Sequence, residues 1–148
     1  MNIRTILVPT DFSDHAGKAL TTAKELAQAL GAKIVVLHAY HVDVPMISPM
    51  AGGAVLPQSF YDDLRAHAKS EVEKLAATVA GDGVEVTGVA LGDPAGLAII
   101  AEAERLPADL IVMGTHGHTG LKHVVLGSVA ERIVRTAPCP VLTVKADA

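Results

Sequence analysis

Short apolar runs alternate with longer amphipathic stretches along the chain. Five runs rich in valine and isoleucine have the length of strands: Thr5–Pro9, Lys33–Ala39, Val84–Leu91, Asp109–Gly114 and Pro140–Lys145. Three of these runs are continuous rather than alternating. Such runs indicate strands that are buried on both faces, and they therefore favour a parallel sheet.

The segments between these runs have the periodicity of amphipathic helices. Four helices are expected. The first has an apolar stripe formed by Leu20, Ala23, Ala27 and Leu30, and it ends at Gly31. The other three run from about Gln58 to Ala80, from Pro94 to about Arg105, and from Gly127-Ser128 to just before Pro138. Ser13 or Asp14 is expected to cap the first helix. Asp93 is expected to cap the third, with Pro94 at its first position.

The order of these elements predicts an α/β fold. Right-handed connections between parallel strands give a single domain over residues 1–148 with an open, doubly wound, five-stranded parallel sheet and four helices on both faces. The one long irregular stretch, residues 41–57, holds three prolines and two adjacent glycines. We interpret it either as a functional lid or as a plain surface connection.

Composition narrows the function classes. The chain has 148 residues, 50% of them hydrophobic, and a formal net charge of −4 without a basic, aromatic-rich stretch, which argues against nucleic-acid binding. Cys139 is the only cysteine, so neither a disulfide framework nor a cysteine zinc site is expected. The short apolar run at the start predicts neither a signal peptide nor a membrane span. We therefore expect a soluble, cytoplasmic protein.

A glycine-rich stretch follows the fourth expected strand. Gly114, Gly117 and Gly120 are three residues apart, and Gly127-Ser128 opens the next helix. Glycines allow a close approach of backbone to ligand, and a helix amino terminus favours a phosphate. Glycines that only form turns would give the same pattern, so both interpretations stay open here. Gly17-Lys18 lacks the flanking residues of a Walker A loop, and no GxGxxG follows the first strand.

The spacing Gly114-x2-Gly117-x9-Gly127-Ser128 resembles the nucleotide-binding pattern of the universal stress protein family. The resemblance covers the whole chain apart from residues 41–57. It extends to ILVPTDFS at the first strand, LHA at the second, GDP after the third, IVMGTHG at the fourth, and GSVAERIVRTAPCPVLTV to the end. It implies the adenine nucleotide alpha hydrolase-like version of the Rossmann-like fold, with the strand order 3-2-1-4-5. It also implies membership of the ATP-binding subgroup.

The resemblance also implies a role for each matching position. Residues expected to contact ATP, ADP or AMP are Pro9, Thr10, Asp11, Ala39, Met113, Gly114, Gly117, His118, Gly127, Ser128 and Val129. Of these, Asp11 would lie by the ribose and phosphates, and the backbone of Ala39 by the adenine. Mg²⁺ or Mn²⁺ would bridge the phosphate oxygens, with no metal site formed by protein groups alone.

Histidines mark a departure from the family pattern. Many relatives carry arginine in the loop where this chain has His116 and His118. Imidazoles lose their charge near neutral pH, so we expect weaker ATP affinity at about pH 8 than at about pH 6. With His123 these residues match no strong metal motif. His38 is interpreted as a packed, hydrogen-bonded core residue.

The resemblance further implies a homodimer that pairs through the last strand, residues 140–145, so that Pro at Val144 would give monomers. The expected function is nucleotide-dependent regulation of an unidentified protein partner in a stress response, without catalytic residues. Two alternatives stay open. One is a slow, metal-dependent ATPase that uses Asp11. The other is a nucleotide-independent dimeric interaction module with residues 41–57 as its partner surface.

Overall fold

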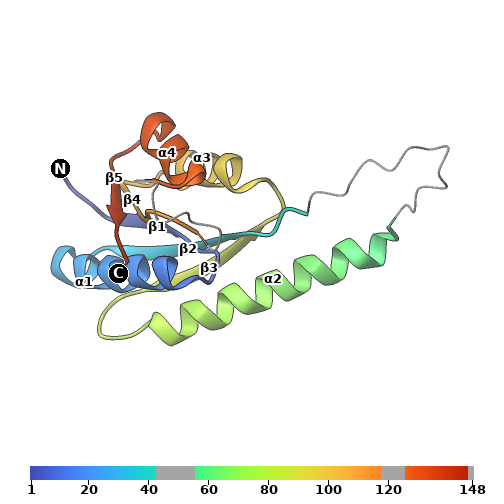
Figure 1. The fold of residues 1–148 in the computed structure, drawn as a ribbon. Helices are drawn as coiled ribbons and strands as arrows, with labels where there is room; N and C mark the ends of the chain where they lie inside the picture. The colour runs from blue at the N-terminus through green and yellow to red at the C-terminus, as the bar shows by residue number, and fades with distance from the viewer. Residues whose placement is uncertain (43–55, 118–125, 147–148) are drawn as a thin grey trace.

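The computed structural model describes residues 1–42, 56–117 and 126–146, which form a parallel sheet flanked by helices (Figure 1). The strands are β1 (Thr5–Pro9), β2 (Lys33–Ala39), β3 (Val86–Leu91), β4 (Leu110–Gly114) and β5 (Val141–Val144). The helices are α1 (Asp14–Leu30), α2 (Gln58–Val79), α3 (Ala95–Arg105) and α4 (Ser128–Thr136). The stretch 43–55 and the residues 118–125, including His118, Gly120 and His123, lie outside the described residues.

The sheet has the order β3-β2-β1-β4-β5 with parallel pairing throughout, which confirms the predicted topology. Strand β1 is central and pairs with β2 on one side and β4 on the other. The chain moves outward through β2 and β3 and then crosses to β4 and β5. The strand order therefore reverses between β1 and β4, where open α/β sheets bind ligands.

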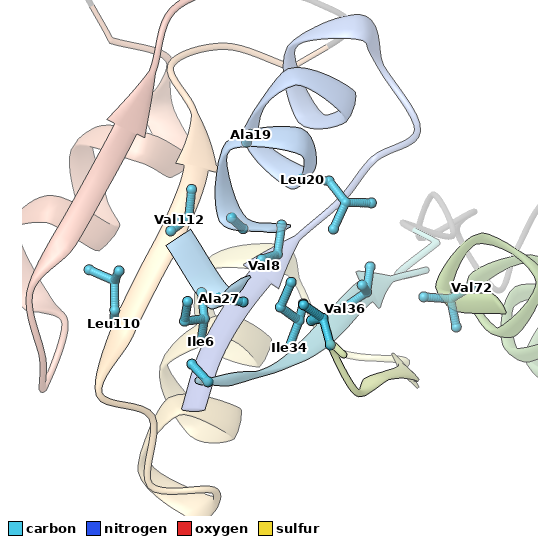
Figure 2. Packing of buried hydrophobic residues seen from close by; sticks show 13 residues of the cluster. Ile6, Val8, Ala19, Leu20, Ala27, Ile34, Val36, Val72, Leu110 and Val112 are labelled. Atoms are coloured by element: carbon cyan, nitrogen blue, oxygen red, sulfur yellow. The ribbon is translucent and has the colours of Figure 1, made fainter. Parts of the chain in front are cut away.

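Alternate residues of each strand pack on opposite faces of the sheet. Ile6 and Val8 of β1 pack with α1 and α2, while Leu7 packs with α3 and α4. Figure 2 shows the first face, where Ile6 and Val8 lie between Ala19 and Leu20 of α1 and the β2 side chains. All three β1 side chains are fully buried. This double burial explains why the strand is a continuous apolar run.

Several predicted boundaries need correction. Pro94 occupies the N-cap position of α3, so Asp93 is not its cap, and no side chain caps this helix. Strand β3 begins at Val86 rather than Val84, because Val84 forms an antiparallel bridge to Gly81 in the preceding turn. Strand β5 is shorter than residues 140–145, and β4 starts at Leu110. The predicted cap Ser13 of α1 is confirmed: its Oγ accepts a bond from the Ala16 N–H at 3.3 Å.

Helix α2 packs closely on β3 and extends past the end of the sheet (Figure 1). A Cβ at Gly88 of β3 would lie 2.7 Å from the Val72 carbonyl oxygen, so only glycine permits this approach. The first turns of α2 are largely exposed, Phe60 and Tyr61 included. Among the described residues, no helix is both long and apolar enough to span a bilayer.

Candidate functional site

A pocket of about 730 Å³ opens at the carboxyl ends of β1, β2 and β4, and we call it the strand-end pocket. The first turns of α3 and α4 also line it. It lies at the reversal of strand order, because the connections after β1 and β4 leave toward opposite faces of the sheet. Sequence segments separated by more than a hundred residues meet there.

The structure brings together ten of the eleven residues predicted to contact nucleotide. The pocket is lined by Pro9, Thr10, Asp11, Ala39, Met113, Gly114, Gly117, Gly127, Ser128 and Val129. His118 lies outside the described residues. These residues lie together because the strands of the sheet are parallel. Each residue lies at or just after the carboxyl end of a strand, or at the start of the helix that follows β4.

Sequence reasoning missed several lining residues. Those added by the structure are Ala16, Leu37, Ala95, Ile99, Thr115, Leu126, Ala130 and Glu131. His116, which the sequence linked to ATP affinity, also lines the pocket. Ala95 and Ile99 are four apart on α3, so one face of that helix borders the pocket. Glu131 of α4 is exposed and also lines the pocket. The helical spacing of Ala95 and Ile99 could have predicted that this face of α3 lines the pocket.

The residues around Thr115 bring the two ends of the glycine-rich stretch together. Thr115 is 3% exposed, and its N–H donates to the Val144 carbonyl at 3.1 Å. Its own carbonyl accepts a bond from the Gly127 N–H at 2.6 Å. The chain on either side of residues 118–125 is therefore anchored at one point. This contact places the start of α4 beside the end of β4.

Two positions, Gly114 and Gly117, require glycine because neighbouring groups approach them closely, rather than because of turn geometry. A Cβ at Gly117 would lie 2.5 Å from Asp11 Oδ2. A Cβ at Gly114 would lie 3.0 Å from the backbone of His15 at the start of α1. A side chain at Gly114 would push against the backbone of α1, whereas a side chain at Gly117 would displace the Asp11 carboxylate.

Helix α4 presents an open amino end to the pocket. Its N-cap is Gly127, which has no side chain to accept the first N–H groups. The first intrahelical bond runs from the Glu131 N–H to the Gly127 carbonyl at 2.9 Å. The N–H groups of residues 128–130 therefore have no acceptor within the helix, and they carry its positive dipole end. Such an end attracts an anion.

Asp11 supplies a carboxylate to the pocket. Its Oδ1 accepts a bond from the Ser13 N–H at 3.0 Å, which closes a tight turn after β1. The pocket also contains the carboxylate of Glu131, paired with Arg135 at 3.0 Å. No group of three or more metal-ligating side chains occurs within residues 1–42, 56–117 and 126–146.

Two other residues considered from sequence lie away from the pocket lining. His38 is half-buried rather than fully buried, and its Nδ1 lies 3.0 Å from the Thr10 carbonyl oxygen. Cys139 is half-buried beyond the far end of α4. Burial first, and then the nearby Asp109 charge, raises the pKa of the Cys139 thiol. A raised pKa disfavours the reactive thiolate.

Comparison with known proteins places this site in a family. The model of the universal stress protein family matches residues 2–145. The chain belongs to the universal stress protein family. It is 37% identical to universal stress protein MJ0531 of Methanocaldococcus jannaschii over 143 residues, which is 96% of this chain and 82% of that protein.

Solved structures of universal stress proteins agree with this fold. The structure of protein MJ0577 from Methanocaldococcus jannaschii superposes with a TM-score of 0.82 at 29% identity, over 100% of this chain and 99% of that one. A universal stress protein solved in complex with cAMP superposes with a TM-score of 0.61 at 26% identity, over 97% and 98% of the two chains.

Proposed function

We propose that the strand-end pocket binds an adenine nucleotide, with ATP as the expected ligand and ADP or AMP as alternatives. The observation that carries this proposal is the open amino end of α4, which meets closely packed glycines in one pocket. The cAMP complex of a structural relative supports the ligand class. Through bound nucleotide this universal stress protein would regulate a protein partner in the cytoplasm.

The two sides of the pocket suit the two ends of a nucleotide. Leu37, Ala39 and Ile99 provide apolar surface for the adenine ring, with Met113 from β4 beside them. Asp11 would accept bonds from the ribose hydroxyls. Ser128 and Val129 would donate backbone N–H groups to the phosphates, whereas the Gly127 N–H already donates to Thr115. Gly127 and Gly117 would instead provide room for the phosphates.

A divalent cation fits this arrangement when it is held mainly by the nucleotide. Asp11 and Glu131 are the acidic residues that line the described part of the pocket, and His116 is its one basic side chain. Mg²⁺ or Mn²⁺ on the phosphate oxygens would offset the repulsion between phosphates and carboxylates. The Ser128 hydroxyl and the Asp11 carboxylate have the hard oxygen donors that such ions prefer.

The subunits would associate as a homodimer through β5. This strand lies at the edge of the sheet, and Leu142 is 38% exposed there. The Val144 carbonyl accepts a bond from Thr115, so the backbone of Val144 faces β4 and that of Thr143 faces outward. Proline at Thr143, rather than at Val144, therefore tests the dimer. We expect Thr143→Pro to be monomeric by light scattering, and an unchanged dimer would refute this interface.

The first experiment identifies the ligand directly. Freshly purified protein is denatured, and released nucleotide is identified by liquid chromatography and mass spectrometry. Stoichiometric adenine nucleotide would support the proposal. Protein that releases none is titrated with Mg-ATP by calorimetry. No heat at millimolar ligand would refute nucleotide binding and favour the interaction module, while repeated turnovers that Asp11→Ala abolishes would favour the ATPase.

A further inference from the structure

Two aromatic rings lie behind the strand-end pocket. The Phe12 and His38 ring centroids are 4.7 Å apart, with an interplanar angle of 57°. Leu37 and Ala39 line the pocket, and side chains alternate along a strand, so His38 points to the opposite face of β2. Neither ring is part of the pocket lining. His38 therefore has no direct route to a bound ligand.

His38 instead holds the residue that precedes Asp11. Its Nδ1 lies 3.0 Å from the Thr10 carbonyl oxygen, which can only accept, so Nδ1 carries the hydrogen and donates. Thr10 makes two further bonds: its N–H donates to the Leu37 carbonyl at 2.8 Å, and its Oγ1 accepts from the Phe12 N–H at 3.1 Å. Thr10 is 7% exposed. The backbone entering Asp11 is thus fixed on several sides.

The residue that follows Asp11 is held by the same histidine. Phe12 has a φ of 63°, a left-handed conformation that is costly for a bulky side chain. Such a conformation persists only where the surroundings stabilise it. Here the Phe12 ring packs on the His38 ring, although 43% of Phe12 is exposed. Asp11 therefore lies between two residues that both depend on His38.

We infer that His38 is a positioning residue for nucleotide binding. From the far face of the sheet it holds Thr10 and Phe12, and this keeps the Asp11 carboxylate in the strand-end pocket. The inference rests on the proposed function, because the carboxylate matters for affinity only if a nucleotide binds there. Since His38 acts through Asp11, its contribution to affinity disappears once the Asp11 carboxylate has been removed.

A double-mutant cycle tests this coupling. His38→Phe keeps a ring against Phe12 and loses the Nδ1 donor, Asp11→Asn removes the charge, and Mg-ATP dissociation constants are measured by calorimetry. His38→Phe weakens binding about tenfold in the wild-type background and has no further effect in Asp11→Asn. His38→Asn, whose amide N–H can replace Nδ1, restores most of the affinity. His67→Phe, on an exposed position of α2, is the matched control and changes nothing.

Equal weakening in both backgrounds would overturn the inference and leave the proposed function intact. Wild-type protein that binds no nucleotide would refute the proposed function. The positioning role of His38 can then be tested without ligand, by hydrogen exchange. The Ser13 N–H donates to Asp11 Oδ1, so His38→Phe increases the hydrogen-exchange rate of that amide about tenfold. An unchanged exchange rate in His38→Phe would refute the positioning role.

Discussion

Helices α1 and α4 both begin beside the strand-end pocket, but their amino ends differ. Both helices have an acidic residue in the first turn, Asp14 in α1 and Glu131 in α4, but of the two only α1 has a side-chain cap, the Ser13 hydroxyl. Helix α4 has Gly127 at its N-cap, with no side chain to accept its first N–H groups. At the start of α1, a side chain of the chain itself accepts a hydrogen bond from the helix N–H groups. At the start of α4, the N–H groups and the positive end of the helix dipole remain available to an anion. If the proposed nucleotide binds in the pocket, this difference predicts that its phosphates lie at the start of α4.

The largest expected effect comes from filling the space in front of α4. Gly117→Val would place a branched side chain where even a Cβ lies 2.5 Å from Asp11 Oδ2. We expect Mg-ATP affinity to fall about 100-fold, as measured by calorimetry. Gly17→Val is the matched control, because nothing lies within 4 Å of a Cβ at that α1 position. Equal losses in both variants would contradict this account.

Making the start of α4 resemble that of α1 should give the next largest effect. In Gly127→Asp, the carboxylate would accept the open N–H groups and repel phosphate. The φ of −67° at this position is compatible with aspartate. A Cβ here would lie 3.2 Å from the Thr115 carbonyl oxygen, and this tight contact offsets the stability gained from the cap. We expect affinity to fall about tenfold while thermal stability changes little. Unchanged affinity would show that phosphate does not lie at this helix end.

A change of pH should lower Mg-ATP affinity less than either of these substitutions. His116 lines the pocket, and the sequence predicts weaker ATP binding at about pH 8 than at about pH 6. We expect Mg-ATP affinity, measured by calorimetry, to fall about threefold between these two pH values. The decrease is compared with that of His116→Gln, which should be smaller. Equal dissociation constants at both pH values in the wild type would contradict the prediction.

Removing the cap of α1 should affect stability and not affinity. Ser13→Ala loses the bond from the Ala16 N–H, and we expect the free energy of unfolding to decrease by about 1 kcal/mol in denaturant titrations. The Ser13 backbone N–H to Asp11 is kept, so Mg-ATP affinity should not change. A marked loss of affinity would show that both helix ends contribute to the ligand site.

The smallest effect of nucleotide binding is expected at Cys139, which lies past the carboxyl end of α4. The raised pKa of Cys139 keeps its thiol neutral to higher pH than a free cysteine, so less thiolate is present at any pH near neutrality. Iodoacetamide should therefore alkylate it severalfold more slowly than free cysteine, with a rate that rises with pH. Mg-ATP should leave that rate unchanged. Protection by nucleotide would place the ligand closer to this end than we propose.

The pattern of apolar residues predicted a doubly wound parallel sheet because its physical cause is local and repeated, whereas the strand order came from the family resemblance. Continuous apolar runs such as Thr5–Pro9 identify strands buried on both faces, and right-handed connections then leave few arrangements. Both ends of α1 were predicted well: the Ser13 hydroxyl caps its start, and the left-handed backbone of Gly31 ends it. The start of α3 was wrong because Asp93 competes with the restricted backbone of Pro94 for the cap. Homodimerisation and a single domain over residues 1–148 stay predictions.

The sequence by itself determined the strands, the helices and the glycines that follow β4, since each depends on neighbouring residues. Only the tertiary structure decided how they combine. Gly117 approaches Asp11, Thr115 joins β4 to α4 and β5, and the first turn of α3 lines the pocket. The role of His38 behind Asp11 is likewise invisible in the sequence, because its contacts with Thr10 and Phe12 cross from β2 to the end of β1. Such contacts depend on strand register, which local sequence preferences do not specify.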